Sequence, residues 1–238
     1  MPSFQPQNSA DQAADHGDFN RVAWFYDALA RVVFGNAQRR AQEAALEHLP
    51  PGAPHVLVLG GGSGWVLGQV LRRRPAATVL YLEASLAMLT RAQALLQREF
   101  PHQQAQVEFC HGTERALPSE GLFDAVVTFF VLDCLTPPAF ATALPRLHAA
   151  LRPGGCWLLA DFSPPHKWWQ HRLLQAMYLF FQVTARLKAK ALPPYEQALA
   201  ELGLHPVYQA RFYSGFLLAL SLQKPAGTET TAVETSRF

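Results

Sequence analysis

The chain has 238 residues and a mass of 26.4 kDa, a length that corresponds to one domain with additions. Half of its residues are hydrophobic and 16% are charged, so the chain can bury a sizeable core and global disorder is excluded. Its 20 basic and 18 acidic side chains leave a formal net charge of +2. This near balance argues against a protein that binds nucleic acid by neutralising phosphates.

The two ends of the chain differ in composition from the rest. Residues 1–17 are polar and lack the apolar run of a signal peptide, so we expect a disordered lead-in. Residues 225–238 are predicted to be a disordered tail for the same reason. The region 18–224 is then a single domain, with a helical lid at 18–49 and a helical cap at 163–203.

In chain order, helical and strand patterns alternate from residue 20 to residue 162. The expected helices cover residues 20–49, 63–74, 85–100 and 138–151, and the expected strands cover residues 55–60, 78–83, 106–110, 123–130 and 156–162. Short apolar strands that alternate with helices are typical of a mainly parallel sheet covered on both faces. We therefore predict an α/β fold of the doubly wound type.

The pattern changes after residue 162. A long helix is expected at 167–190 and a shorter one at 195–203. Two apolar runs follow at 207–213 and 216–222, and only two residues, Ser214 and Gly215, separate them. Such a closely spaced pair predicts an antiparallel hairpin at the C-terminal end, which brings the expected sheet to seven strands.

The strongest local signal is a glycine-rich loop between the first expected strand and the helix after it. It reads Gly-Gly-Gly-Ser-Gly over residues 60–64. Glycines let the backbone turn tightly and approach a ligand closely, and the following helix presents free N–H groups. Because a tight turn alone needs fewer glycines, we expect a ligand here.

An acidic residue, Glu83, ends the second expected strand. A carboxylate at this place can accept hydrogen bonds from ribose hydroxyls, in either a dinucleotide or S-adenosylmethionine. The dinucleotide pattern G-x-G-x-x-G needs glycine at position 65, where this chain has Trp65. The loop thus favours S-adenosylmethionine over a nicotinamide dinucleotide.

Five motifs in this order resemble those of the class I S-adenosylmethionine-dependent methyltransferases. They lie at residues 56–64, 82–89, 111–118, 123–127 and 151–155. The resemblance covers residues 19–224 and implies a Rossmann-like methyltransferase fold with S-adenosyl-L-methionine as cofactor. The cofactor-binding residues that we expect are Gly60, Gly61, Gly62, Gly64, Glu83, Ala84, Met88, Thr113, Glu114 and Phe129.

Two positions depart from the family pattern. The family usually has an acid two residues before the first glycine, where this chain has Val58. The family's Asp beside the adenine is replaced by Thr113, with Glu114 next to it, and either side chain can meet the adenine amino group. These departures keep a non-catalytic, methyltransferase-like binding protein as an alternative. A dinucleotide-dependent oxidoreductase is the other alternative.

Residues 19–29, which contain Tyr26, are similar to the opening of the ubiquinone/menaquinone C-methyltransferases and their relatives. There, a Tyr-Asp pair leads into a helix that covers the cofactor. The resemblance makes Tyr26 a candidate contact to the cofactor or the substrate. A core aromatic on a helix would show the same pattern.

Methyl transfer from a sulfonium chiefly requires that donor and acceptor are held in line and that water is excluded. A general base is needed only where the acceptor loses a proton. Asp133, after the fourth strand, and His166, after the fifth, are the candidate bases, and both positions also suit ordinary loop residues. We expect no metal, because His166 and His171 are five residues apart and Cys110, Cys134 and Cys156 form no CxxC pair. Reduced thiols fit a cytoplasmic protein.

The expected helix after the fifth strand is rich in aromatic residues between positions 168 and 181. Side chains of this kind line apolar pockets, so they favour a small, lipophilic methyl acceptor. Basic residues on the same segment would allow peripheral contact with anionic lipid at most. The alternative is that this helix covers the sheet or a homodimer interface.

Overall fold

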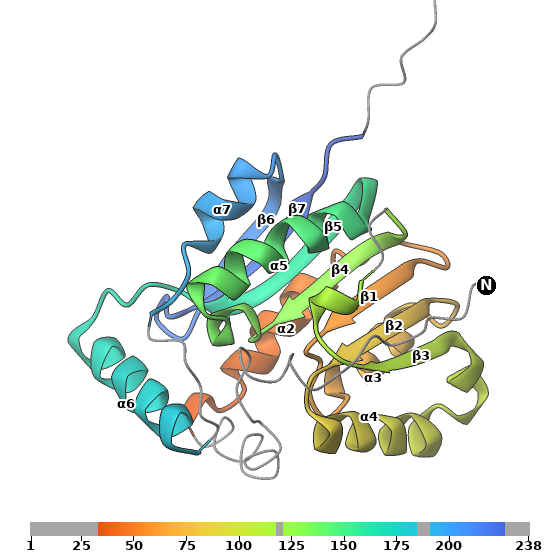
Figure 1. Ribbon diagram of the computed structural model, residues 1–238, viewed down its shortest axis with the longest axis horizontal. Helices are drawn as coiled ribbons and strands as arrows, with labels where there is room; N and C mark the ends of the chain where they lie inside the picture. The colour runs from red at the N-terminus through yellow and green to blue at the C-terminus, as the bar shows by residue number, and fades with distance from the viewer. Residues whose placement is uncertain (1–32, 118–120, 185–190, 227–238) are drawn as a thin grey trace, which may run out of the picture.

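The computed structural model describes residues 33–117, 121–184 and 191–226 of the chain (Figure 1). The strands are β1 (His55–Leu59), β2 (Thr78–Glu83), β3 (Val107–His111), β4 (Phe123–Phe129), β5 (Leu151–Phe162), β6 (His205–Phe212) and β7 (Leu217–Gln223). They form one seven-stranded sheet in the order β3-β2-β1-β4-β5-β7-β6. Strand β7 runs antiparallel to both of its neighbours, and every other neighbouring pair is parallel.

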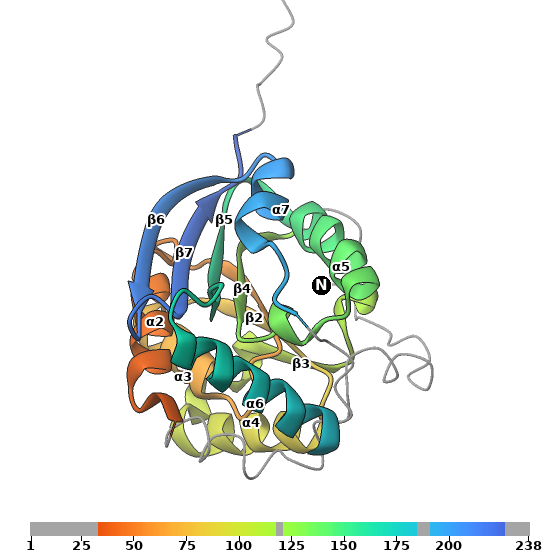
Figure 2. The same ribbon diagram turned by 90° about the vertical axis from the view of Figure 1, so that its left-hand side faces the viewer.

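Helices cover both faces of this sheet (Figure 2). They are α2 (Ala37–Leu46), α3 (Trp65–Arg73), α4 (Leu86–Glu99), α5 (Pro137–Ala150), α6 (Trp168–Thr184) and α7 (Tyr195–Glu201). Helices α2, α3 and α4 pack on one face, and α5 and α7 pack on the other. Helix α6 crosses the end of the sheet toward which β6 points (Figure 2).

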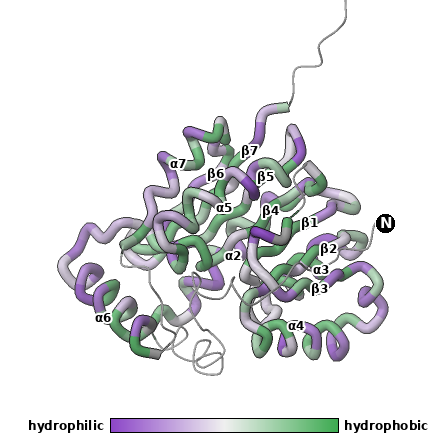
Figure 3. Tube along the Cα trace, in the orientation of Figure 1, coloured by the Kyte–Doolittle hydropathy of each residue, from purple (hydrophilic) through white to green (hydrophobic). Residues whose placement is uncertain are grey.

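The apolar runs of the central strands are explained by burial on both faces. In β1, Val56 and Val58 belong to the core cluster under α2 and α3, whereas Leu57 and Leu59 belong to the cluster under α5. Successive side chains of a strand point to opposite faces, so a strand covered twice must be apolar throughout. Figure 3 shows that α4, by contrast, alternates between hydrophobic and hydrophilic residues along its turns.

The strand order places a ligand crevice. Chain connections run from β1 outward to β2 and β3 on one side, and then return to β4 on the other side of β1. Where the strand order reverses, the loops after β1 and β4 separate and leave a crevice at the carboxyl ends of the strands.

The doubly wound, mainly parallel fold with a C-terminal antiparallel hairpin is confirmed, and the structure corrects several boundaries. The expected helix 20–49 is not continuous, because Gly35 has φ +56° and α2 begins only at Ala37. Strand β5 begins at Leu151 rather than at residue 156, because Leu151 pairs with Phe123 before the register shifts. The turn predicted at 152–155 is therefore part of the strand.

Some predictions fall on residues that the structure does not describe. The lead-in 1–17 and residues 18–32 of the lid 18–49, including Tyr26, lie outside the described residues, as do 185–190 at the end of the expected long helix and 227–238 of the tail. Within the described ranges, no helix is both long enough and apolar enough to cross a membrane.

Candidate functional site

A cavity of about 280 Å³ opens at the carboxyl ends of β1, β2 and β4. The loops after β1, β2, β3 and β4 line it, together with the start of α2, the end of β5 and one residue of α6. The predicted cofactor residues that line this cavity are Gly60, Gly61, Gly62, Glu83, Ala84, Met88, Thr113, Glu114 and Phe129. The structure thus brings together residues that are up to 69 positions apart in the chain (Gly60 and Phe129).

The glycine-rich loop is shaped by packing as much as by access to the cavity. A Cβ atom on Gly61 would lie 2.4 Å from the hydroxyl oxygen of Tyr81, and one on Gly64 would lie 2.8 Å from the backbone of Ala92 in α4. Gly64 does not line the cavity, so its predicted contact with the cofactor is not supported. Gly62 has φ +64° and nothing within 4 Å of its Cβ position, so it is the glycine with open space beside it.

Glu83 is anchored to the loop by two backbone hydrogen bonds. Its Oε2 accepts the N–H of Gly62 at 2.9 Å, and its Oε1 accepts the N–H of Ser85 at 2.8 Å. Burial raises the pKa of Glu83, and these bonds and the nearby His111 oppose the rise because they favour the carboxylate. A carboxylate has about four acceptor sites, so the two oxygens can still accept bonds from ligand hydroxyls.

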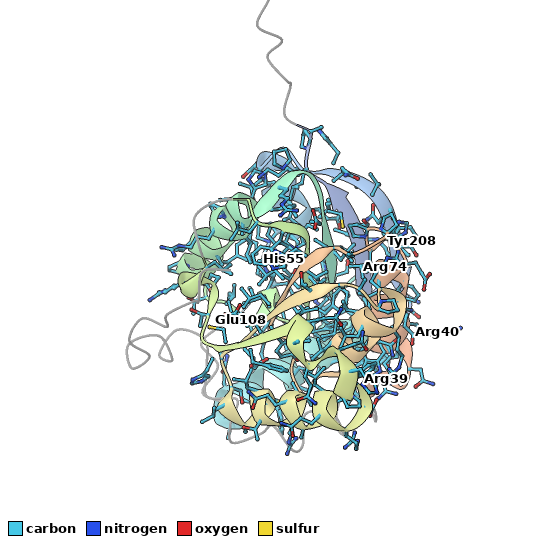
Figure 4. All side chains as sticks on the ribbon, turned by 90° about the vertical axis from the view of Figure 1, so that its right-hand side faces the viewer. Arg39, Arg40, His55, Arg74, Glu108 and Tyr208 are labelled. Atoms are coloured by element: carbon cyan, nitrogen blue, oxygen red, sulfur yellow. The ribbon has the colours of Figure 1, made fainter. Side chains whose placement is uncertain are left out.

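The start of α2 lies in the segment predicted as a lid and forms a wall of the cavity, but the sequence did not indicate which of its residues line it. Gln38, Arg39 and Gln42 line the cavity from this helix, and the Arg39 guanidinium lies over the ring of Trp65, 5.6 Å from its centroid. Figure 4 shows Arg39 and its neighbour Arg40 near the edge of the molecule, with Arg40 directed outward. No local sequence pattern predicts which residues of α2 line the cavity, because this depends on how α2 packs beside α3.

The two departures from the family pattern lie in different surroundings. Val58 is 1% exposed, belongs to the core cluster under α2 and α3, and does not line the cavity. Thr113 and Glu114 are both buried and both line the cavity. The Thr113 hydroxyl also caps a short 3-10 helix, because it accepts the N–H of Arg115 at 3.5 Å.

Asp133 also lines the cavity, from the 3-10 helix η4 (Leu132–Cys134) that follows β4. The side chain is 9% exposed, and its Oδ1 accepts the thiol S–H of Cys134 at 3.4 Å. Burial raises the pKa of Asp133 from its ordinary value of 3.8 to about 6, although the bond from Cys134 opposes the rise. A carboxyl group of this pKa is well suited to general-base chemistry near neutral pH.

Aromatic side chains also line the cavity. The ring centroid of Phe162 lies 5.4 Å from the ring centroids of both Phe34 and Phe130, and all three residues line the cavity. Phe130 has φ +52°, a left-handed conformation that is uncommon for a bulky residue and often marks a functional site. The hydroxyl of Tyr213 also donates to the backbone oxygen of Val33 at 2.9 Å, so the turn between β6 and β7 holds the segment before α2 in place.

The other predicted catalytic residues are not at the cavity. His166 is exposed and does not line it, and the His166 backbone N–H donates to the side chain of Gln170 at 2.8 Å. This location does not support a catalytic role for His166. Tyr26 lies outside the described residues.

The aromatic helix α6 is divided between the two uses predicted for it. Met177 lines the cavity and Tyr178 packs against Cys134. Trp169 instead packs against Tyr213, with ring centroids 5.5 Å apart. Trp168 is 79% exposed and contributes nothing to the cavity.

Metal binding has no visible basis in this part of the chain. The described residues contain no group of three or more His, Cys, Asp or Glu side chains placed to hold a metal ion. Their cysteines, Cys110, Cys134 and Cys156, are free thiols.

Comparisons with known proteins agree with this geometry. The family model for a methyltransferase domain matches residues 56–155. A ubiquinone/menaquinone biosynthesis C-methyltransferase of Paracoccus denitrificans is 29% identical over 150 residues, which are 62% of this chain and 58% of that protein. A demethylmenaquinone methyltransferase of Thermus thermophilus is 31% identical over 154 residues, which are 63% of this chain and 66% of that protein. The chain thus spans about three fifths of the length of the curated relatives that it matches.

A solved structure shares the fold over most of the chain. It is the 1,6-didemethyltoxoflavin-N1-methyltransferase of Burkholderia thailandensis, with bound 1,6-didemethyltoxoflavin and S-adenosylhomocysteine. The TM-score is 0.63 at 21% identity, and the match covers 86% of this chain and 85% of that one. Family model, relatives and fold agree with one another, and the chain belongs to the class I S-adenosylmethionine-dependent methyltransferase family.

Proposed function

We propose that the protein transfers a methyl group from S-adenosylmethionine to a small, apolar acceptor that gives up a proton. The observation that carries this proposal is the composition of a single cavity. The carboxylate of Glu83 lines it beside an open glycine, Gly62, and Asp133 lines it together with aromatic side chains. A nucleoside and an apolar acceptor would therefore meet in the same space.

Glu83 and the predicted adenine-binding residues fit the cofactor. Glu83 would accept hydrogen bonds from the ribose hydroxyls, and Met88, Thr113 and Glu114 would enclose the adenine. Arg39, at the rim beside the start of α3, would bind the carboxylate of the methionine part. This contact would supply binding energy at the amino-acid end of the cofactor, where Val58 offers no polar group.

The chemistry divides between cofactor and protein. S-adenosylmethionine supplies a methyl group on a sulfonium, and the sulfur keeps the electron pair of the bond that breaks. The aromatic walls exclude water and hold the acceptor in line, while Asp133 accepts the proton that the acceptor loses as it forms its bond to the methyl group. The protein adds no redox step.

The apolar lining around Asp133 supports a lipophilic acceptor. Phe34, Phe130, Phe162 and Met177 form apolar walls, and Asp133 is the carboxyl group among them. An acceptor with one acidic O–H, N–H or activated C–H on an apolar frame matches this arrangement. The free cysteines of the described residues support a reducing compartment, the cytoplasm.

Calorimetric titration tests the cofactor part of the proposal. We expect the full chain to bind S-adenosylmethionine and S-adenosylhomocysteine but not NAD, because Trp65 occupies the position of the third dinucleotide glycine. Binding of NAD alone would support an oxidoreductase. Binding of none of the three would support a non-catalytic protein.

Labelled methyl transfer into cell extracts tests the acceptor part. Extracts are separated into lipophilic and polar fractions after incubation with the protein and S-adenosylmethionine labelled in the methyl group. We expect the label in the lipophilic fraction, with Asp133→Asn as the control that lacks the base. Label in polar metabolites alone would contradict a lipophilic acceptor.

A further inference from the structure

A second buried carboxyl group, Asp161, lies behind Asp133 and takes no part in lining the cavity. Asp161 is near the end of β5 and is 0% exposed. Its Oδ1 accepts the N–H of Phe162 at 2.8 Å. The rest of the Asp161 carboxyl faces the backbone amide of Asp133 and the hydroxyl of Tyr195. Two carboxyl groups therefore share one buried region, and only Asp133 reaches the cavity.

Several polar atoms in this region are left without partners. Asp161 Oδ2, the hydroxyl of Tyr195 and the hydroxyl of Tyr178 have no hydrogen bond of normal geometry to any described residue. Tyr195 is 3% exposed and Tyr178 is 9% exposed, so water does not reach them freely. Buried polar groups are normally paired, and unpaired ones often mark a site with a chemical role.

The surroundings offer no compensating positive charge. Among the described residues, the titratable groups that face the two carboxyl groups or their thiol neighbour are Cys134 of η4, Tyr178 of α6, Tyr195 of α7 and Glu83 of β2. Arg211 of β6 is on the same face of the sheet as Asp161, two strands away, and its guanidinium binds Ser163 and Glu196 instead. Two buried carboxylates without a cation cannot both stay ionised.

We propose that Asp161 is a positioning residue for the acceptor site, a buried carboxyl that keeps its proton while Asp133 is the carboxylate that meets the acceptor. The inference rests on the proposed function only for the role of Asp133 as base. The location of the proton is a property of the folded protein and can be measured without the reaction.

The direction of the pKa changes agrees with this division. Burial, and after it the negative charge of Asp133, raises the pKa of Asp161 well above its usual range. Burial raises the pKa of Asp133 only to about 6. Burial also raises the pKa values of Tyr178 and Tyr195, so both hydroxyls remain donors at neutral pH.

For catalysis, this division means that the base, Asp133, has a neutral carboxyl, Asp161, as its neighbour. A neutral Asp161 leaves the charge of Asp133 free to take the acceptor's proton, whereas an ionised one would repel that charge. The proton moves from the acceptor to Asp133 and then to water, and Asp161 neither gains nor loses one during the reaction. Above the pKa of Asp161 the repulsion appears and activity falls.

Infrared spectroscopy of the full chain at pH 7.5, without cofactor, measures the proton directly. We expect the carbonyl stretching band of a protonated carboxyl in the parent protein and in Asp133→Asn, and its loss in Asp161→Asn. The control is Asp124→Asn, at a carboxylate that pairs with Arg152 at 2.7 Å, and it should retain the band. Absence of the band from the parent would overturn the proposal, as would its survival in Asp161→Asn or its loss in Asp133→Asn.

A second variant keeps the test valid should Asp161→Asn fold poorly. Tyr195→Phe removes the hydroxyl that faces Asp161, so the band should shift in frequency but persist. An unshifted band would show that Asp161 is not its source and would overturn the assignment.

Where methyl transfer is measured, the pH profile separates positioning from a merely structural role. We expect Asp161→Asn to keep the acid limb of kcat/KM within about half a pH unit of the parent and to lose the alkaline limb, because an amide cannot ionise. An alkaline limb unchanged by the substitution would contradict the role of Asp161. Failure of the protein to methylate any acceptor would leave the infrared result intact, so the two proposals fail separately.

Discussion

The carboxylate of Glu83 and the backbone N–H of Gly62 are joined by a hydrogen bond of 2.9 Å, across the gap between the ends of β2 and β1. The acid and the glycine-rich loop are thus one structural unit. The same carboxylate holds the N–H of Ser85 at the start of α4. A ligand that binds Glu83 therefore meets a group that the protein has already fixed in place.

Glu83→Ala should weaken the binding of S-adenosylmethionine about 10- to 100-fold, because each hydrogen bond to a charged group is worth about 1.5–3 kcal/mol. Calorimetry gives the Kd. Since Glu83 also holds Gly62 and Ser85, thermal unfolding without ligand must be measured beside it. Affinity equal to that of the parent would disprove the ribose contact.

Arg39→Ala should weaken the same binding by about 10-fold, because it removes a cation at the rim of the cavity. Arg40→Ala is the matched control, since Arg40 is the adjacent exposed arginine and does not line the cavity. Titrations of the two variants should differ. If both weaken binding equally, the effect is one of general charge and the assignment to Arg39 is wrong.

Gly64→Ala should destabilise the fold more than Gly62→Ala. Both substitutions force an L-residue to positive φ at about 1–2 kcal/mol. At Gly64 the new methyl would also meet the backbone of Ala92 at 2.8 Å, which adds about 1–3 kcal/mol of overpacking. Urea unfolding measures both free energies, and equal losses would refute the role of Gly64 in packing.

Asp133→Asn should make the protein more stable and less active above pH 6. The folded pKa of Asp133 is raised from 3.8 to about 6, so the parent loses stability as pH rises through this interval. The variant avoids that loss, a gain of about 3 kcal/mol at pH 7. Loss of the base should slow methyl transfer about 10²- to 10⁴-fold.

Chemical unfolding at pH 4 and at pH 7 checks the sign of the Asp133→Asn effect, because the gain should be near zero at pH 4. If the difference in free energy of unfolding between the variant and the parent is the same at pH 4 and at pH 7, the pKa of Asp133 is not raised by folding. Activity that survives the substitution would remove Asp133 from the mechanism.

Much of the fold follows from local pattern, because its central strands are buried on both faces and read as unbroken apolar runs. The strand at 78–83 was predicted with the bounds that β2 has, and Ser85 caps α4 as a serine before a helix should. The break at Gly35 was not predicted. A single glycine in a helical pattern does not indicate whether its φ will be positive.

The candidate site was predictable where it follows the strands and not where it depends on packing. Glu83 is the last residue of β2, and Asp133 lies in η4, the first element after β4, so their place at the cavity follows from topology. Arg39 and Asp161 gave no such signal. Arg39 lies on a helix whose position beside α3 is a tertiary contact. Asp161 is an acid inside an apolar strand, and the groups near it come from η4 and α7.

The contact between Phe34 and the last hairpin has a consequence for biosynthesis. The ring of Phe34 lies 5.4 Å from that of Tyr213 and 6.5 Å from that of Phe216, so residues near the beginning of the described chain meet residues near its end. A ribosome-bound chain that has not yet released residue 216 lacks the support for this wall of the cavity. This wall of the cavity can therefore form only after residue 216 has been synthesised, and chains truncated before it should bind the cofactor more weakly.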